Sequence, residues 1–171
     1  MSLKNVVSRC TLALASAAGK LQTLQIRMLA GEVKDAVEHL EPYGFTSHPK
    51  PGAEGVAVFP GGDRSHGVVV VLADRRYRLQ GLKTGEMAIH DDQGQCVHLT
   101  RAGIVIKGAG KPIVMTDAAK LRVECPIECT HDITDKVDSG GSSMAAMRQV
   151  YDNHDHPGDS GGTTGKPNQG M

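Results

Sequence analysis

The stretch "LRVECPIECTHDIT", residues 121–134, decides the fold class because apolar and polar residues alternate along its whole length. Successive side chains of a β-strand point to opposite faces, so this period of two indicates a strand with one buried and one solvated face. The candidate buried residues stand at odd positions: Leu121, Val123, Cys125, Ile127, Cys129 and Ile133.

An ordinary sheet does not accommodate this strand well. It is longer than the roughly 3–10 residues typical of globular sheets, and Pro126 in its middle cannot donate a ladder hydrogen bond. The apolar face is also narrow, so a single chain would leave it in water. Three copies around an axis would bury it and leave no open edge. We therefore expect a homotrimer with this face as its core.

Asp135 continues the odd register of the same stretch. Three inward carboxylates around an axis need a cation, and their oxygen ligands favour calcium. In the alternative, the register breaks before the run Asp138-Ser139-Gly140-Gly141 and Asp135 is solvated.

Further strands are expected on the N-terminal side of this stretch. Short β runs ("EMAIHDD", "CVHLT", "GIVIKG") recur about every ten residues, which is typical of stacked or meandering strands. Earlier runs at 22–28, 56–59 and 68–73 predict a compact all-β unit that ends near Gly85. The run "VKDAVEHL", residues 33–40, instead has the apolar spacing of a helix.

One turn in this unit, "PGGDRSHG", contains Asp63, Ser65 and His66, the residue types of a catalytic triad. Triad residues come from separated positions because neighbours in one turn cannot align nucleophile, base and acid. We interpret it as a polar turn in which Asp63 accepts hydrogen bonds from backbone amides.

Composition limits the function classes. Lys plus Arg and Asp plus Glu both number 19, so no net charge favours nucleic acid, and we expect no nucleic-acid partner. Aromatic residues make up 3% and glycines number 21, which suits narrow β structure better than a large core. The four cysteines have no metal-ligand spacing and are interpreted as small buried hydrophobes. The first residues, with Lys4 and Arg9 before a short apolar run, resemble a signal peptide, although an ordinary helix or strand is the alternative we favour.

The stretch "YDNHDHPGDSGGTTGKPNQGM", residues 151–171, places His154 and His156 one residue apart. In an extended segment both rings point the same way, and Pro157 favours that geometry. Around a threefold axis, six imidazole nitrogens would form an octahedral site that suits Fe(II), Ni(II) or Co(II) better than zinc. One alternative is a disordered polar tail. Another is a mononuclear hydrolase site with Asp159 as third ligand.

Residues 38–95 and 147–169 resemble the baseplate spike proteins of Mu-type contractile-tailed phages. The resemblance implies an all-β trimer in which residues 20–85 form an OB-fold domain after an N-terminal segment, 1–19. Residues 86–137 would form an intertwined trimeric β-helix, and residues 138–171 an apex. It also implies one iron ion (Fe²⁺) per trimer, held by His154 and His156, and a strand at "VKDAVEHL".

The function implied by this resemblance is structural. The trimer would sit at the centre of the tail baseplate of the virion, after synthesis in the host cytoplasm, and contact baseplate hub proteins through its N-terminal domain. It would pierce the host outer membrane when the sheath contracts, with no enzymatic activity. The competing function is a β-helical adhesin for a receptor or polysaccharide.

Overall fold

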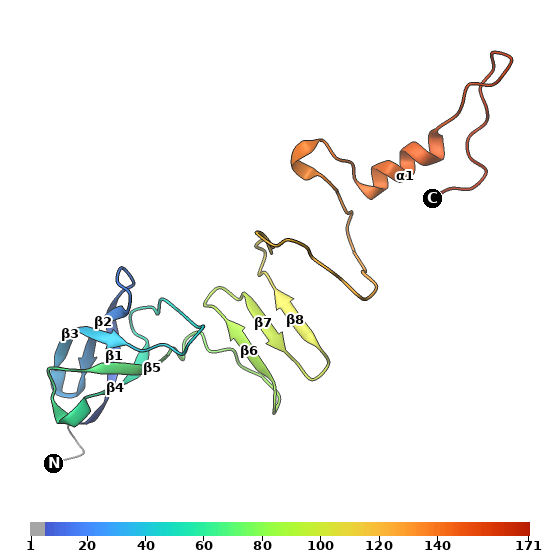
Figure 1. Cartoon of the computed structure of the whole chain (residues 1–171). Helices are drawn as coiled ribbons and strands as arrows, with labels where there is room; N and C mark the ends of the chain where they lie inside the picture. The colour runs from blue at the N-terminus through green and yellow to red at the C-terminus, as the bar shows by residue number, and fades with distance from the viewer. Residues whose placement is uncertain (1–5) are drawn as a thin grey trace. The chain divides into compact units, whose positions relative to one another are not determined.

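The computed structural model describes residues 6–171, which divide into one unit that extends to Val114 and a second that comprises Met115–Met171 (Figure 1). We describe each unit by itself. The first contains β1 (Val7–Ser16), β2 (Gln22–Met28), η2 (Leu29–Gly31), β3 (Val33–His39), β4 (Glu54–Val58), η3 (Pro60–Gly62), β5 (Val68–Ala73), β6 (Met87–His90), β7 (Cys96–Leu99) and β8 (Ile104–Lys107). The second contains η4 (Val137–Ser139) and α1 (Met144–Asn153).

The first five strands form a closed barrel in the order β1-β2-β3-β5-β4. All neighbouring pairs are antiparallel except β3 and β5, which run parallel and close the barrel. The alternation in β2 places its apolar side chains inside, where Leu24 and Ile26 are fully buried. The core consists of Cys10, Leu12, Leu24, Ile26, Met28, Val37, Ala53, Ala57, Phe59 and Val69.

Tight curvature of the barrel depends on irregularities in three strand pairs. The register shifts between Leu12 and Leu14 in β1, between Leu24 and Ile26 in β2, and between Val56 and Ala57 in β4. Such bulges bend a strand and increase its twist, which allows a small sheet to close. At Gly55 the strands approach so closely that a Cβ atom would lie 2.5 Å from the carbonyl oxygen of Val71. Glycine is therefore required there by space.

The barrel begins earlier in the chain than the domain boundary expected at residue 20. β1 pairs with both β2 and β4 and contributes Cys10 and Leu12 to the core, so the barrel begins before residue 20. Within the described residues, the signal-like stretch is thus a barrel strand, while Lys4 lies outside them.

The helical interpretation of residues 33–40 is wrong, and the strand implied by the resemblance is confirmed. The apolar residues of this segment are spaced as in a helix, but hydrogen-bonded pairing with β2 makes it a strand. Ala36 adopts a φ of 53°, which interrupts the alternation, and Val37 and His39 then point inward. The ring of His39 is buried and shares a 2.9 Å hydrogen bond with the side chain of Gln22.

The three short runs predicted after Gly85 are confirmed as β6, β7 and β8, an antiparallel meander outside the barrel. They belong to the first unit, whereas the residues from Met115 onward belong to the second. The segment 86–137 predicted as one domain is therefore divided between the two units.

The second unit differs most from the expectation. Residues 121–133 form no ladder with any other part of the described chain, and every one of them is exposed. The trimeric core predicted there remains a prediction, because a ladder between copies is not part of a single chain. Helix α1 was not anticipated. The regular elements of the described residues are mostly strands, and α1 is a short helix among them. No helix among them is both long and apolar enough to cross a bilayer.

Candidate functional site

Helix α1 sets the position of His154, which is its C-terminal cap. Two oxygens hold the first turn of the helix: Ser143 Oγ accepts from the Ala146 amide at 3.1 Å, and Asp132 Oδ1 accepts from the Ala145 amide at 3.2 Å. Both bonds satisfy amides that have no partner inside the helix. A hydrogen bond from the Ser143 hydroxyl, with the amides of Ala145 and Ile133, lowers the pKa of Asp132.

The ring of His154 folds back onto the end of α1. Its Nδ1 lies 2.5 Å from the carbonyl oxygen of Tyr151, and its ring centroid lies 5.4 Å from the Tyr151 ring. A carbonyl oxygen can only accept, so this bond requires the proton to be on Nδ1. Nε2 of the neutral ring then carries a free lone pair. This is the arrangement of a histidine ligand whose second nitrogen is fixed by a backbone carbonyl.

His156 is held by a hairpin rather than by the helix. Its amide donates to Thr164 Oγ1 at 2.9 Å, and its carbonyl accepts from the Thr164 amide at 2.9 Å. Pro157 and Thr163 form a β-bridge one residue further along, and the loop between them turns at Gly158–Gly161. The glycine-rich segment therefore folds back on itself and fixes the backbone of His156.

The two rings lie next to each other, as the prediction of a shared direction requires. Their centroids are 5.0 Å apart and their planes meet at 87°. Two imidazoles bound at right angles to one ion, with nitrogen–metal distances of ~2.1 Å, would have centroids about 4.6 Å apart. The observed centroid separation is close to the spacing that two ligands of one ion would have.

The part of the chain that the structure describes completes no metal site by itself. Within residues 6–171, no group of three or more His, Cys, Asp or Glu side chains could hold a metal ion. Asp159 is exposed, and the structure does not bring it to the histidine pair as a third ligand. Two imidazoles leave most positions of an octahedral ion to ligands from elsewhere.

Asp135 has a partner within its own loop. Its Oδ1 accepts from the Ser142 amide at 3.0 Å, beside the bridge that joins Thr134 to Ser143. The carboxylate thus helps to close the loop from 134 to 143. The calcium site at Asp135 remains a prediction that this contact does not support.

The structure reveals an apolar surface that the sequence interpretation missed. Cross-strand pairing in the meander aligns Met87 with Leu99 and Ile104, and Ile89 with Val97 and Ile106. Paired residues point to the same side of a sheet, so all six side chains share one face. We call it the apolar sheet face. Its exposed fractions run from 37% to 70%, because no other part of the described chain covers it. Alternation within β6, β7 and β8 was the sequence signal that could have identified it.

The apolar residues at odd positions of 121–133 are likewise exposed in the single chain. Leu121 and Ile127 are each about two-thirds exposed in the single chain, and Cys125 and Cys129 are exposed thiols. Burial of these two cysteines between copies stays a prediction, whereas Cys10 in the barrel is buried as expected.

The turn with triad-like residues is confirmed as a polar turn. The Ser65 amide donates to Asp63 Oδ1 at 2.8 Å, and the Ser65 hydroxyl donates to the same oxygen at 2.7 Å. These bonds lower the pKa of Asp63. The Ser65 hydroxyl donates to the acid, and its oxygen also lies 3.4 Å from Nδ1 of His66. The acid therefore contacts the serine directly, whereas in a triad the histidine lies between them.

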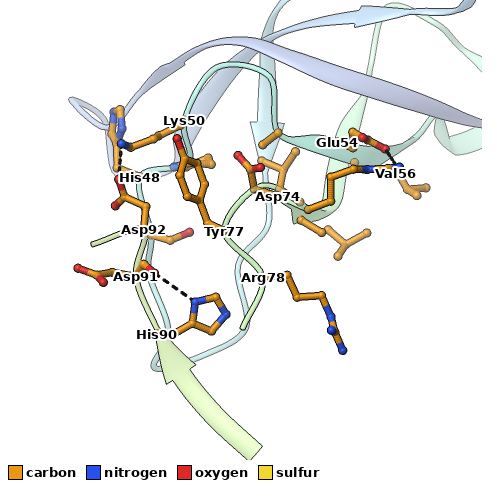
Figure 2. Close-up of a pocket in the computed structure, with 18 of the residues that line it drawn as sticks. His48, Lys50, Glu54, Val56, Asp74, Tyr77, Arg78, His90, Asp91 and Asp92 are labelled. Atoms are coloured by element: carbon orange, nitrogen blue, oxygen red, sulfur yellow. Dashed lines mark hydrogen bonds and ion pairs between the residues drawn. The ribbon is translucent and has the colours of Figure 1, made fainter. Parts of the chain in front are cut away.

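A hollow of about 910 Å³ lies in the first unit, where loops of the barrel meet the turn after β6 (Figure 2). Its charged side chains are mostly paired: Lys50 with Asp92, and both Arg9 and Arg75 with Glu54. The hollow is wide and open, and the Lys50–Asp92 pair links the loop before β4 to the β6–β7 turn. This supports a structural junction.

Comparison with known proteins matches both ends of the chain. Residues 9–76 match the family described as "Bacteriophage Mu Gp45, N-terminal", and residues 150–168 match the "GpV Apex motif", which contains His154 and His156. The chain is 35% identical over 159 residues to the baseplate puncturing device gp45 of Escherichia phage Mu, covering 85% of this chain and 80% of that protein. It is 34% identical over 163 residues to the Mu-like prophage FluMu protein gp45 of Haemophilus influenzae, covering 90% and 87%.

These matches confirm the predicted resemblance to Mu-type baseplate spikes. The chain belongs to the bacteriophage Mu Gp45 family.

Proposed function

We propose that the protein is the central spike of a contractile-tail baseplate, a homotrimer that punctures the host outer membrane when the sheath contracts. The observation that carries the proposal is the histidine pair of the apex motif, with adjacent rings and the Nε2 of His154 free. The name of the phage Mu relative, a baseplate puncturing device, supports the same function.

The apolar sheet face supports a trimer. Full burial of a Val, Leu, Ile or Met side chain stabilises by ~1.5–3 kcal/mol. About half of each of the six side chains is still exposed, so burying them between copies would stabilise by about 5–10 kcal/mol per chain. Three such faces around an axis can offset the cost of association, which is about 4–15 kcal/mol. Together with the alternation from Leu121 to Ile133, the face supports the proposal that residues 86–137 form a trimeric β-helix.

The barrel is the OB-fold domain of this arrangement. Its strand order and the parallel contact between β3 and β5 are those of a five-stranded Greek-key barrel, which supports the assignment. Its place at the opposite end of the chain from the histidines suits it to contact the baseplate hub proteins. The protein then belongs to the tail of the virion and is made in the host cytoplasm.

The histidine pairs of three chains would hold one iron ion. Such an ion supplies a six-coordinate link between three chains, with no position left for water or substrate, so its role is structural. The protein's own contribution is orientation: the Tyr151 carbonyl sets the tautomer of His154, and the hairpin through Thr164 fixes His156. Residues 157–171 have little apolar surface and depend on this link for order.

Native mass spectrometry with metal analysis tests the proposal. We expect a trimer with one iron per three chains. The double variant His154→Ala, His156→Ala should remain trimeric and lose the metal, because the apolar sheet face is untouched. Phage particles carrying it should assemble normally and infect less efficiently.

The matched control is His66→Ala, His90→Ala, which removes two exposed histidines outside the apex. It should retain one iron per trimer. A monomeric protein, one metal per chain, or full iron retention in the apex variant would each contradict the proposal.

A further inference from the structure

Helix α1 carries an apolar stripe that stays partly exposed in the described chain. Met144, Met147 and Tyr151 follow one another at spacings of three and four residues, and His154 comes three residues later. These four residues, the α1 stripe, hold the a-d-a-d spacing of a coiled-coil heptad. The other faces of the helix carry Ala145, Ala146, Arg148, Gln149, Asp152 and Asn153, together with the exposed Val150 next to the stripe.

The stripe is open to solvent along its length. No residue of α1 is buried, and Met144, Met147 and Tyr151 are 38–44% exposed. They border a hollow of about 610 Å³ that also reaches His154 and Met171. A helix of ten residues is marginal in water without packing. Its caps at Ser143 and Asp132 favour the first turn but do not bury the stripe.

His154 connects the stripe to the metal ligands. Its ring lies against Tyr151, so the side of the helix that faces the metal is the side that carries the stripe. If the histidine pairs of three chains meet at one ion, their stripes must converge on the same axis. This step rests on the proposed function.

Contacts at the first residues of α1 also place the stripe next to the predicted trimer core. The Met144 amide donates to the Ile133 carbonyl at 2.9 Å, and Thr134 bridges Ser143. Ile133 is the last apolar residue of the alternating stretch predicted to line the trimer core. The stripe therefore begins beside that core and ends at the metal ligands.

We propose that α1 packs against α1 of two other copies of this chain, through the α1 stripe, and forms a three-helix collar immediately before the metal. The number of partners follows from the site, because two imidazoles per chain complete six positions only with three chains. The collar holds His154 in place before metal binds. It also protects α1 from fraying in the metal-free trimer.

The test compares Met147→Glu, which places three carboxylates inside the collar, with Gln149→Glu on the opposite side of the helix. Glu, Gln and Met have similar helix propensities, so the comparison isolates packing. Each variant is measured for native mass, for iron release to a chelator, and for amide hydrogen exchange of α1 in metal-free protein. We expect trimers in both, with iron release at least tenfold faster and α1 exchange at least tenfold faster in Met147→Glu only. Met147→Leu should behave as the unchanged protein.

The measurements separate this proposal from the proposed function. A monomer, or a protein that binds no metal, would overturn the proposed function. An iron-loaded trimer in which Met147→Glu and Gln149→Glu release iron at the same rate, with α1 unprotected in the metal-free form, would overturn the collar alone. A trimer that binds no iron when iron is supplied, but whose protected α1 is exposed by Met147→Glu, would support the collar and refute the metal site.

Discussion

Replacing Ile104 by Ala tests the apolar sheet face, because Ile104 is its most exposed member at 70%. The change removes three carbons, worth ~0.8 kcal/mol each when fully buried. Scaled by the exposed fraction, which is the part that only another copy can bury, the loss is about 1.7 kcal/mol per chain. Each trimer then loses about 5 kcal/mol, which is more than three orders of magnitude in its dissociation constant.

For a trimer in equilibrium with three monomers, the midpoint concentration varies as the square root of that constant. Ile104→Ala should therefore raise the midpoint about 60-fold, as estimated from the burial energy of the removed carbons. Sedimentation equilibrium in a fixed concentration of mild denaturant, approached from both assembled and dissociated protein, measures this shift.

The matched control is Val105→Ala, in the same strand but on the opposite face of the meander. Its midpoint should move no more than a few-fold. Equal shifts in the two variants would refute the assignment of the apolar sheet face to the interface between copies.

Three further predictions concern other parts of the chain. Gly55→Ala places a Cβ atom 2.5 Å from the Val71 carbonyl oxygen and should destabilise the barrel by about 1–3 kcal/mol in thermal unfolding, whereas Gly162→Ala, with open space around it, should not. The pKa of Asp132 lies below its usual 3.8, so its stabilisation of α1 is complete above that pH and is lost as pH falls through the lower, folded value. The protection factors of the α1 amides, which correct for the slower intrinsic exchange in acid, should fall there, and Asp132→Ala should remove this change. Ser65→Ala should leave infectivity unchanged, and a loss comparable to that of the apex double variant would revive the catalytic interpretation of the turn.

Regular alternation was the part of the fold that could be predicted from the residues. β2 and β5 have the predicted bounds, because each has a strong local signal and regular partners. β3 could not be found by periodicity, because Ala36 at positive φ shifts the pattern so that it imitates a helix. The strand was identified only through the resemblance.

At the site, residue spacing predicts the relation between the two histidines but not the contacts that depend on helix α1. The shared direction of His154 and His156 follows from spacing, and the structure confirms adjacent rings. Helix α1 was missed because its stripe contains two methionines and a tyrosine among glycine-rich neighbours, a weak apolar signal. The bond between His154 and the Tyr151 carbonyl depends on that helix, so no sequence pattern could have indicated it.

An anomalous scattering map from crystals of the protein, recorded above and below the iron absorption edge, tests the central claim most directly. The account predicts one iron peak on a threefold axis, bound by nitrogens of His154 and His156 from three chains. A separate peak in each chain away from any axis, or a threefold axis at the histidines with no metal on it, would contradict the account.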